Sequence, residues 1–295
     1  MINKNSILIT SLGRTGTEFF AKFFQDILPD CVSLHEPDIF ELQSLKIPNY
    51  RDRLINAGIW RLVVLKLLGK WSLVKISDER FFGRIDGEKA AQFLVKQRES
   101  FISERPGSIY VESNIGYYGL LDVTPLAFKN HKAVLIVRDG RDWVRSAINW
   151  GEIYGKKGIR KYFSHTWPSA EKVPGDALAS SWNQASEFQK ACWAWANLNA
   201  YAIKTMQQNP AARMYKFEDI FKGPDRYDYL NDLVRFTTAL PGIDPASLKK
   251  TDGWLDQKIH PSSNQFPAWQ EWTAQQKNQF DEICGPLMSR LNYHY

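Results

Sequence analysis

The sequence predicts a three-layer α/β fold in which helices flank both faces of a central parallel β-sheet. Short apolar segments of strand length alternate with longer segments of helical period, as they do in βαβ units. The segment AVLIV at 133–137 is apolar at every position, which suits a strand buried on both faces of a parallel sheet. No internal repeat and no Pro/Gly/Ser-rich linker divides the 295 residues, so we expect one domain spanning residues 1–295.

The chain opens on a predicted strand, loop and helix within residues 6–24. An apolar segment, ILI at 7–9, is followed by a glycine-containing loop, after which four phenylalanines recur at helical spacing. A second strand is predicted to end in CVSLHEPD at 31–38. The period then becomes mostly helical, and we expect a helical insertion at about 45–105.

Further strands are predicted in the second half of the chain. One covers SIYVES at 108–113, and another lies in KAVLIVRDGRD at 132–142. Helices are predicted to dominate from there to 207, and RMYKFEDI at 213–220 is a further strand candidate. Ligands bind at the carboxyl ends of the strands in sheets of this kind, so polar residues that directly follow a strand are candidate site residues.

The composition predicts an ordered globular protein, with 44% hydrophobic residues available for a core. Cys31, Cys192 and Cys284 have no Cys or His partners at metal-ligand spacing. We therefore expect neither a disulfide framework nor a metal site, and a reducing compartment fits best. The first strand follows the N-terminus without a leader, and the most apolar later segment, at 62–73, is too short to span a membrane. We expect a cytoplasmic protein without a membrane partner.

The charge balance admits several anionic partners. With 38 Lys+Arg against 32 Asp+Glu, the net charge is +6 and the pI is about 9.0. No Lys/Arg-rich block of nucleic-acid type is present, and the densest basic segment, GKKGIRK at 155–161, is short enough for a solvated loop. We expect no nucleic-acid partner, and charge alone does not choose among the remaining anions.

The loop Gly13-Arg14-Thr15-Gly16-Thr17 is the first candidate site. Arg14 supplies a permanent cation, Gly16 lets the backbone approach an anion, and Thr15 and Thr17 add hydroxyl donors at a helix N-terminus. The loop of nucleoside-triphosphate enzymes requires a lysine after its second glycine, and this chain has Thr17 there. The alternative interpretation is a plain strand-to-helix turn.

The second candidate follows the second strand, in Leu34-His35-Glu36-Pro37-Asp38. A carboxylate just past a buried strand, beside a histidine, is placed as a general base would be. We expect Pro37 to keep Glu36 extended. The alternative interpretation is a polar turn whose acid is merely solvated.

The third candidate is VRDGRDWVRS at 137–146, which follows the AVLIV strand. Arg138 and Ser146 stand on opposite sides of the predicted turn into a helix, so they could converge on one phosphate. Asp139 and Asp142 would then orient the neighbouring arginines. The alternative is a salt-bridged surface turn, although the apolar segment before it indicates burial.

Together these segments resemble the sulfotransferases that use 3'-phosphoadenosine 5'-phosphosulfate (PAPS). SLGRTGTEF is similar to the family's 5'-phosphosulfate loop, and VRDGRDWVRSAINW is similar to its 3'-phosphate motif, with a serine eight residues after the first arginine. HEPDIF is similar to the Glu-Pro segment of the carbohydrate sulfotransferases, YKFEDI to the Tyr-Glu-Asp strand, and the C-terminal helical segment is also of familiar type. Residues 45–105 and 150–205 have no recognisable counterpart.

The resemblance implies a P-loop NTPase-like fold and transfer of a sulfuryl group from PAPS without a metal. The acceptor would be a hydroxyl, or less readily an amine, of a small molecule or carbohydrate. The implied catalytic residues are Glu36 as base, His35 and Arg14. The implied cofactor-binding residues are Arg14, Thr15, Gly16, Thr17, Glu18, Phe19, Arg138 and Ser146. Phe19 would stack on adenine, with Phe217 contributing, and a core role for both rings is the alternative.

The chain also departs from the family pattern. His35 stands where the carbohydrate branch has lysine, so a permanent cation is lost unless His35 shares the role of base. Glu18 occupies a position that is often Thr, Ser or Arg. The family's loop that closes over the nucleotide has no obvious counterpart, and KIHPSSNQ at 258–265 is the candidate replacement.

Two other classes of function remain as alternatives. A P-loop nucleotide kinase or hydrolase would require Mg²⁺ and ATP, and the missing Gly-Lys argues against it. A non-enzymatic nucleic-acid or glycan-binding module is suggested by the positive charge and the 11 tryptophans. Six of these could line an acceptor pocket or form core, at positions 143, 150, 167, 182, 193 and 195.

Overall fold

The computed structural model describes residues 1–38, 72–151, 153–154, 167–256 and 265–293 of the chain. Within these ranges five strands form one parallel sheet in the order β2-β3-β1-β4-β5. The strands are β1 (Asn5–Thr10), β2 (Cys31–His35), β3 (Ile109–Ser113), β4 (His131–Val137) and β5 (Ala212–Lys216). The predicted α/β fold with a parallel sheet is confirmed, and the central strand leads directly into the glycine loop, as in P-loop-like folds.

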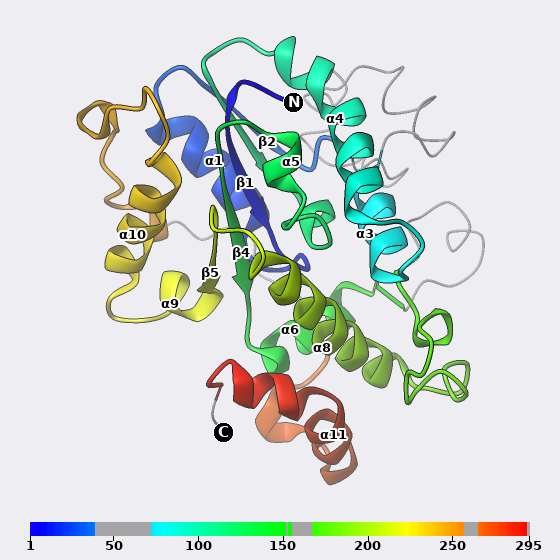
Figure 1. Cartoon of the computed structure of the whole chain (residues 1–295). Coiled ribbons are helices and arrows are strands. Elements are labelled where there is room, and N and C mark those ends of the chain that lie inside the picture. The colour runs from blue at the N-terminus through cyan, green and yellow to red at the C-terminus, as the bar shows by residue number, and fades with distance from the viewer. Residues whose placement is uncertain (39–71, 152, 155–166, 257–264, 294–295) are drawn as a thin grey trace.

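The register aligns the carboxyl ends of neighbouring strands. Ile9 of β1 pairs with Ser113 of β3 on one side and with Val134 of β4 on the other. His35 of β2 also pairs with Ser113. The loops that follow β1, β2 and β4 therefore leave the sheet at the same edge, which is the lower edge in Figure 1.

One face of the sheet is covered by α1 (Thr17–Ile27), α9 (Phe217–Phe221) and α10 (Arg226–Thr238). The four phenylalanines of α1 pack there with the side chains that β1 directs to this face, Ile7 and Ile9. Their helical spacing places all four rings on the buried side of α1, which explains why the segment folds as a helix against the sheet.

A larger core lies on the opposite face. Side chains of six helices contribute to it: α3 (Leu73–Phe81), α4 (Gly87–Ser103), α5 (Thr124–Ala127), α6 (Gly140–Trp150), α8 (Glu187–Met206) and α11 (Ala274–Arg290). Helix α8 packs between α6 and α11, and Ser186 begins it with a capping box. Short 3₁₀ helices occupy Ile115–Tyr117, Ala170–Lys172, Pro245–Ser247, Trp254–Asp256 and Trp269–Glu271.

The tryptophans divide between core and surface. Five of the six named above are buried, at positions 143, 167, 182, 193 and 195. Trp150, at the end of α6, is 42% exposed. Most of these rings therefore stabilise the core, and Trp150 is the member of this set that faces solvent.

The last predicted strand is shorter than expected, and the expected helical insertion lies partly outside the described residues. The strand predicted at 213–220 ends at Lys216, and Phe217 begins α9. Glu218 and Asp219 lie in the first turn of that helix, where carboxylates are favoured by the helix dipole. Helices α3 and α4 occupy part of the expected insertion at about 45–105, but residues 39–71 lie outside the described residues, and the insertion stays a prediction.

None of the helices described here combines the length and the apolar character that crossing a membrane requires. Across the described ranges, no three His, Cys, Asp or Glu side chains come together as a metal-binding group would.

Candidate active site

The loop between β1 and α1 reverses direction through residues with positive φ. Gly13 has φ +76°, Arg14 has φ +56° and Gly16 has φ +80°. A Cβ added at Gly16 would approach Cζ of Phe221 to 3.0 Å, so a larger residue would be strained there on both counts. Gly16 is also the N-cap of α1 and carries no capping side chain, which leaves the helix N-terminus suited to an anion.

Side chains from inside and outside the loop fix its shape. Ser11 Oγ accepts hydrogen bonds from the Gly13 amide, at 3.1 Å, and from the buried Thr15 hydroxyl. Trp143 Nε1 of α6 donates to the Gly13 carbonyl at 3.1 Å, and Arg138 Nη1 donates to the Arg14 carbonyl at 2.8 Å. The loop and the segment that follows β4 therefore form one structural unit.

Arg14 meets the third candidate segment through its side chain. Its Nε donates to Ser146 Oγ at 3.1 Å, and its guanidinium lies 5.7 Å from the ring centroid of Trp150. Removal of the guanidinium from water, together with the charge of Arg138, lowers the pKa of Arg14. Two permanent cations thus share this edge of the sheet, and an anion between them would relieve their repulsion.

Arg138 is held from several sides. Its guanidinium lies 4.8 Å from the ring centroid of Phe217, and Nη2 is 3.8 Å from Oδ2 of Asp142. Burial lowers the pKa of Arg138, although Asp142, Glu218 and Asp139 oppose this effect. Its Nε is buried without a hydrogen-bond partner among the described residues. Such a donor is expected to have an acceptor, and a bound anion would supply one.

The carboxylates of this segment bind neighbouring donors. Asp139 accepts hydrogen bonds from Arg141 Nε at 3.0 Å and from the Arg141 amide at 2.9 Å. The second of these bonds caps the N-terminus of α6. Asp142 binds Lys222 of the segment after α9. The Asp139 amide donates to Glu218 at 3.2 Å, and the Tyr293 hydroxyl donates to Glu218 at 2.9 Å. Residues from two distant parts of the chain, the segment at 218–222 and Tyr293, therefore brace the turn.

His35 and Glu36 lie beside the first residue of α1. His35 Nε2 is 3.0 Å from Thr17 Oγ1 and 3.7 Å from Glu36 Oε1. The Glu36 side chain is 14% exposed, so it is sheltered but still reachable from solvent. Together these distances bring the second candidate segment to the start of the anion loop, through Thr17.

The expected extended conformation of Glu36 is wrong. Its φ is +44°, in the left-handed region, although Pro37 follows it and favours extended backbone at the preceding position. The Glu36 amide donates to the Ser113 carbonyl at 2.9 Å, which holds the residue to the end of β3. Glu36 therefore keeps a left-handed backbone, held by a tertiary hydrogen bond, against the local preference for extended backbone.

Two predicted cofactor-binding residues have other contacts in this structure. Glu18 Oε1 lies 2.8 Å from Lys22 Nζ, one turn further along α1. Phe19 is 3% exposed and stacks on Phe23 with centroids 5.5 Å apart. Phe217, which is only partly buried, lies under Arg138. The adenine contact of Phe19 stays a prediction, and the proposed closing segment at 258–265 lies outside the described residues except for its last position.

No protein-family model matches the chain, and no curated protein matches it either. Solved structures do match over nearly its full length. Three of them are sulfotransferases. The chain is similar to a sulfotransferase from Alicyclobacillus acidocaldarius, with 12% identity and a TM-score of 0.44, over 97% of this chain and 93% of the other.

Two further matches are sulfotransferase domains. The sulfotransferase domain from the curacin biosynthetic pathway is 16% identical, with a TM-score of 0.41 over 100% of this chain and 99% of the other. The sulfotransferase domain from the Synechococcus PCC 7002 olefin synthase is 13% identical, with a TM-score of 0.42 over 100% of this chain and 97% of the other. At these identities and TM-scores the likeness carries no functional inference, which must come from the site itself.

The roles of several site residues were not predicted from the sequence. Ser11 shapes the anion loop, as does Trp143, which was expected only as pocket lining or core, and Glu218 and Tyr293 brace the turn after β4. Ser11 directly follows β1, so its place at a strand end was the available signal. The other three act through contacts between segments more than 70 positions apart, which spacing along the chain does not reveal.

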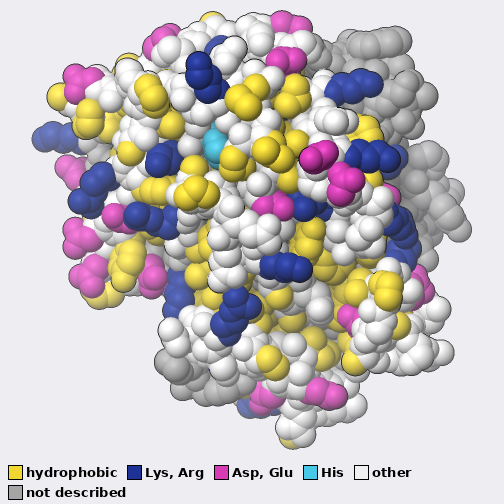
Figure 2. Space-filling model, in the orientation of Figure 1, with side chains coloured by type: hydrophobic (Ala, Val, Ile, Leu, Met, Phe, Trp, Pro, Cys, Tyr) yellow, Lys and Arg dark blue, Asp and Glu magenta, His cyan; other side chains and the backbone are white. Residues whose placement is uncertain are grey.

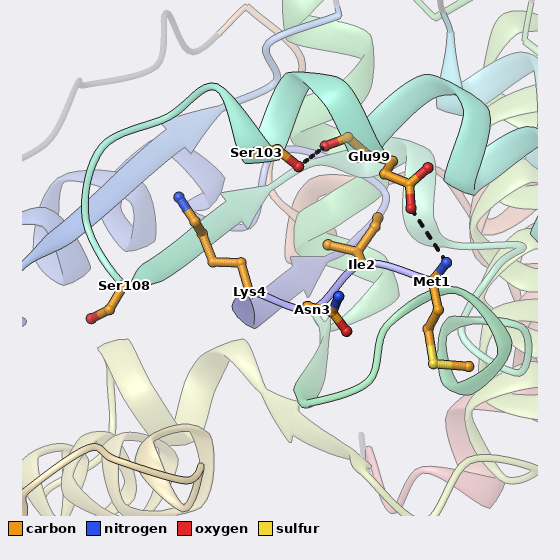
Figure 3. Close-up of a pocket in the computed structure, with 7 residues that line it drawn as sticks. All are labelled: Met1, Ile2, Asn3, Lys4, Glu99, Ser103 and Ser108. Carbon is orange, nitrogen blue, oxygen red and sulfur yellow. Dashed lines mark hydrogen bonds and ion pairs between the residues drawn. The ribbon is translucent and has the colours of Figure 1, made fainter.

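A separate hollow of about 410 Å³ lies at the opposite edge of the sheet (Figure 3). It is lined by Met1, Ile2, Asn3, Lys4, Glu99, Ser103 and Ser108. Lys4 and Ser108 directly precede β1 and β3, so this hollow adjoins the amino ends of the strands. It contains none of the candidate site residues.

Proposed function

We propose that the protein transfers a sulfuryl group from PAPS to a hydroxyl, or less readily an amine, of a small-molecule or carbohydrate acceptor. The observation that carries the proposal is the meeting of Arg14, Arg138 and Ser146 at the carboxyl edge of the sheet, beside an uncapped helix N-terminus. These donors come from two loops and suit a ligand that carries two separate anionic groups.

The residues present fit the nucleotide that the resemblance implies. The two glycines of the loop leave room for close backbone approach, and the buried Nε of Arg138 has no partner among the described residues. Arg14 and the amides of α1 would hold the 5'-phosphosulfate, with Thr15, Thr17 and Glu18 in the same loop and turn. Arg138 and Ser146 would hold the 3'-phosphate.

PAPS supplies an activated sulfuryl group, with adenosine 3',5'-bisphosphate as the leaving group. Glu36 would accept the proton of the acceptor hydroxyl as its oxygen bonds to sulfur, while the bond from sulfur to the phosphate oxygen breaks. Arg14 and the helix N-terminus would stabilise the charge that develops on the leaving phosphate. His35, between Thr17 and Glu36, would orient the carboxylate or share its proton.

The alternative functions fit the site less well. A nucleotide kinase or hydrolase would need a lysine where Thr17 stands and a metal-binding residue beside it. A nucleic-acid module would present a continuous basic surface. On the face drawn in Figure 2, Lys and Arg side chains are instead interspersed with Asp and Glu.

Incubation with a metabolite extract and PAPS tests the proposal. Mass spectrometry should detect acceptors heavier by one sulfonate, together with release of adenosine 3',5'-bisphosphate, without an added metal. A metabolite that instead gains a phosphate, and only with ATP and Mg²⁺, would establish the kinase alternative.

A further inference from the structure

A buried ionic cluster begins two residues after the proposed base, at Asp38. Asp38, two residues after Glu36, is 1% exposed. Its Oδ2 accepts the backbone N–H of Leu73 at 2.7 Å, and its Oδ1 accepts Asn114 Nδ2 at 2.6 Å. Arg98 Nη2 lies 3.4 Å from the same Oδ1. Asp38 thus ties the end of the β2 turn to α3, to the end of β3 and to α4.

The cluster continues to a second carboxylate, Glu112 of β3. Arg98 donates to Glu112 through Nε at 2.9 Å and through Nη2 at 2.8 Å, and Asn114 Nδ2 donates to it at 2.7 Å. Burial opposes the charge of Arg98, but Glu112 and Asp38 outweigh burial and raise the pKa of its guanidinium well above the ordinary value. Arg98 is therefore charged at every relevant pH.

Two tyrosines complete the shell around Glu112. Tyr110 donates to Glu112 Oε2 at 2.7 Å, and Tyr117 donates to the same oxygen at 3.1 Å. Burial and then the Glu112 carboxylate raise the pKa of both phenols well above the ordinary value, so both stay protonated and donate. A cluster with this many partners holds its members in one arrangement.

The backbone of Glu36 needs such an anchor. A residue other than glycine keeps a φ of +44° only where its surroundings hold it there. Before the turn, the Glu36 amide is bound to the Ser113 carbonyl. After the turn, Pro37 has no N–H to donate, so the next side chain able to fix the backbone is Asp38.

We propose that Asp38 is a positioning residue that holds the Glu36 carboxylate beside His35 and the start of α1. This inference rests on the proposed function, because it requires Glu36 to be the base. Asp38 acts only through the backbone of the turn, because its own carboxylate is buried and bound to Leu73 and Asn114.

Asp38→Asn is the variant that tests this role. The two groups closest to the carboxylate, the Leu73 amide and Asn114 Nδ2, are both donors, and an asparagine offers only one acceptor oxygen to them. One anchor is therefore lost. The variant also removes one negative charge from a cluster of two carboxylates and one guanidinium, which leaves Arg98 and Glu112 as a neutral pair, so folding is expected to survive.

Asp122→Asn provides a matched control. Asp122 binds Arg80 of α3 through both oxygens, with Oδ2 at 2.8 Å from Nη2, and its side chain is 12% exposed. Asp122 and Arg80 thus form another sheltered Asp–Arg pair that holds α3 in place. In the described structure no bond connects this pair to the Glu36 turn. A general loss of α3 packing would affect both variants.

The experiment is a double-mutant cycle combined with crystallography. Turnover is followed as release of adenosine 3',5'-bisphosphate from PAPS in the metabolite extract, and affinity for the bisphosphate by calorimetry. Asp38→Asn should lower turnover about ten- to a hundredfold with affinity unchanged, because small displacements of catalytic groups have effects of this size. In the Glu36→Gln background the same change should have little further effect, since residues that act as a unit are not additive.

Crystal structures of the wild-type protein and of Asp38→Asn give a readout that does not depend on activity. The proposal predicts that Glu36 leaves the left-handed region in the variant, while Asp122→Asn leaves it in place and leaves turnover near wild type. Equal losses of turnover in the wild-type and Glu36→Gln backgrounds, or an unchanged Glu36 backbone in Asp38→Asn, would overturn it. If the wild-type protein transfers no sulfuryl group, the proposed function fails, and the two crystal structures still decide the role of Asp38.

Discussion

Arg14 Nε donates a hydrogen bond to Ser146 Oγ at 3.1 Å, although 132 positions separate the two residues. The contact arises because β1 and β4 are neighbours in a parallel sheet, so the loop after one strand meets the helix after the other. Arg138 extends the contact by donating to the Arg14 carbonyl. This junction is the proposed binding site for a nucleotide with two anionic ends.

Adenosine 3',5'-bisphosphate should raise the melting temperature of the protein without added divalent metal. A ligand that binds only the folded state stabilises it by mass action, and the donors assembled here are side chains and backbone amides. Differential scanning fluorimetry with and without EDTA measures the effect. The absence of any shift up to millimolar ligand would contradict the nucleotide assignment.

Glu36→Gln should lower turnover by roughly a hundredfold or more, the usual scale of general-base catalysis, with bisphosphate affinity nearly intact. Release of the bisphosphate from PAPS in the metabolite extract measures turnover, and calorimetry measures affinity. His35→Ala is measured beside it, because His35 lies 3.7 Å from the Glu36 carboxylate. Near-normal turnover in Glu36→Gln, with a large loss in His35→Ala, would move the role of base to the histidine.

Asp78 of α3 should make stability depend on pH. Burial raises the pKa of this carboxyl to about 8, and Tyr118 donates to it at 2.7 Å. Between the unfolded pKa, near 3.9, and about 8, the folded state binds a proton that the unfolded state lacks, so this group's contribution to stability is lost as pH rises through that window.

Urea titrations of the wild-type protein and of Asp78→Asn between pH 6 and 9 check this sign. The wild-type protein should lose more stability with rising pH than the variant, because the amide has no proton to release. Parallel pH profiles for the two proteins would show that Asp78 does not titrate as described.

The sheet, its parallel strands and the meeting of three polar segments at one edge could be predicted because they follow from local signals. Buried parallel strands are apolar at every position, and their carboxyl ends share an edge. The pairing of Arg14 with Ser146 was not read from the sequence, but placing both segments at strand ends was sufficient to bring them together.

The conformation of Glu36 could not be predicted, because it depends on contacts made across the fold. Pro37 alone favours extended backbone, whereas the Ser113 carbonyl and the partners of Asp38 favour the left-handed turn. Arg98 lies 60 positions after Asp38 and reads as an ordinary helix residue of α4. Its burial becomes evident only when α4 packs on the sheet.

For Phe19, two signals in the sequence point to different roles. Its position five residues after Arg14 implies stacking on adenine by resemblance, while the spacing of the four α1 phenylalanines indicates the core. In the structure Phe19 is packed among aromatic rings. Phe19 lies on the buried face of α1, in its first turn. The helical spacing of the phenylalanines shows which face of α1 is buried, but it does not show whether a ring in the first turn also contacts a ligand bound at the helix N-terminus.

The recognition of the 3'-phosphate is the most direct test of the whole account. A charge-assisted hydrogen bond contributes about 1.5 to 3 kcal/mol, so Arg138→Ala should weaken adenosine 3',5'-bisphosphate by roughly ten- to a hundredfold. Adenosine 5'-monophosphate lacks the group that Arg138 is proposed to hold, and its affinity should scarcely change. Ser146→Ala should have a smaller effect in the same direction. Arg141→Ala is the matched control, because Arg141, in the first turn of the same helix as Ser146, is bound to the N-cap residue Asp139.

Calorimetry of both nucleotides with the wild-type protein, Arg138→Ala and Arg141→Ala is therefore the decisive measurement. The account predicts a large loss of bisphosphate affinity confined to Arg138→Ala, with binding of the monophosphate nearly equal in all three proteins. Equal weakening of the two nucleotides by Arg138→Ala would make this arginine structural and would contradict the placement of the 3'-phosphate.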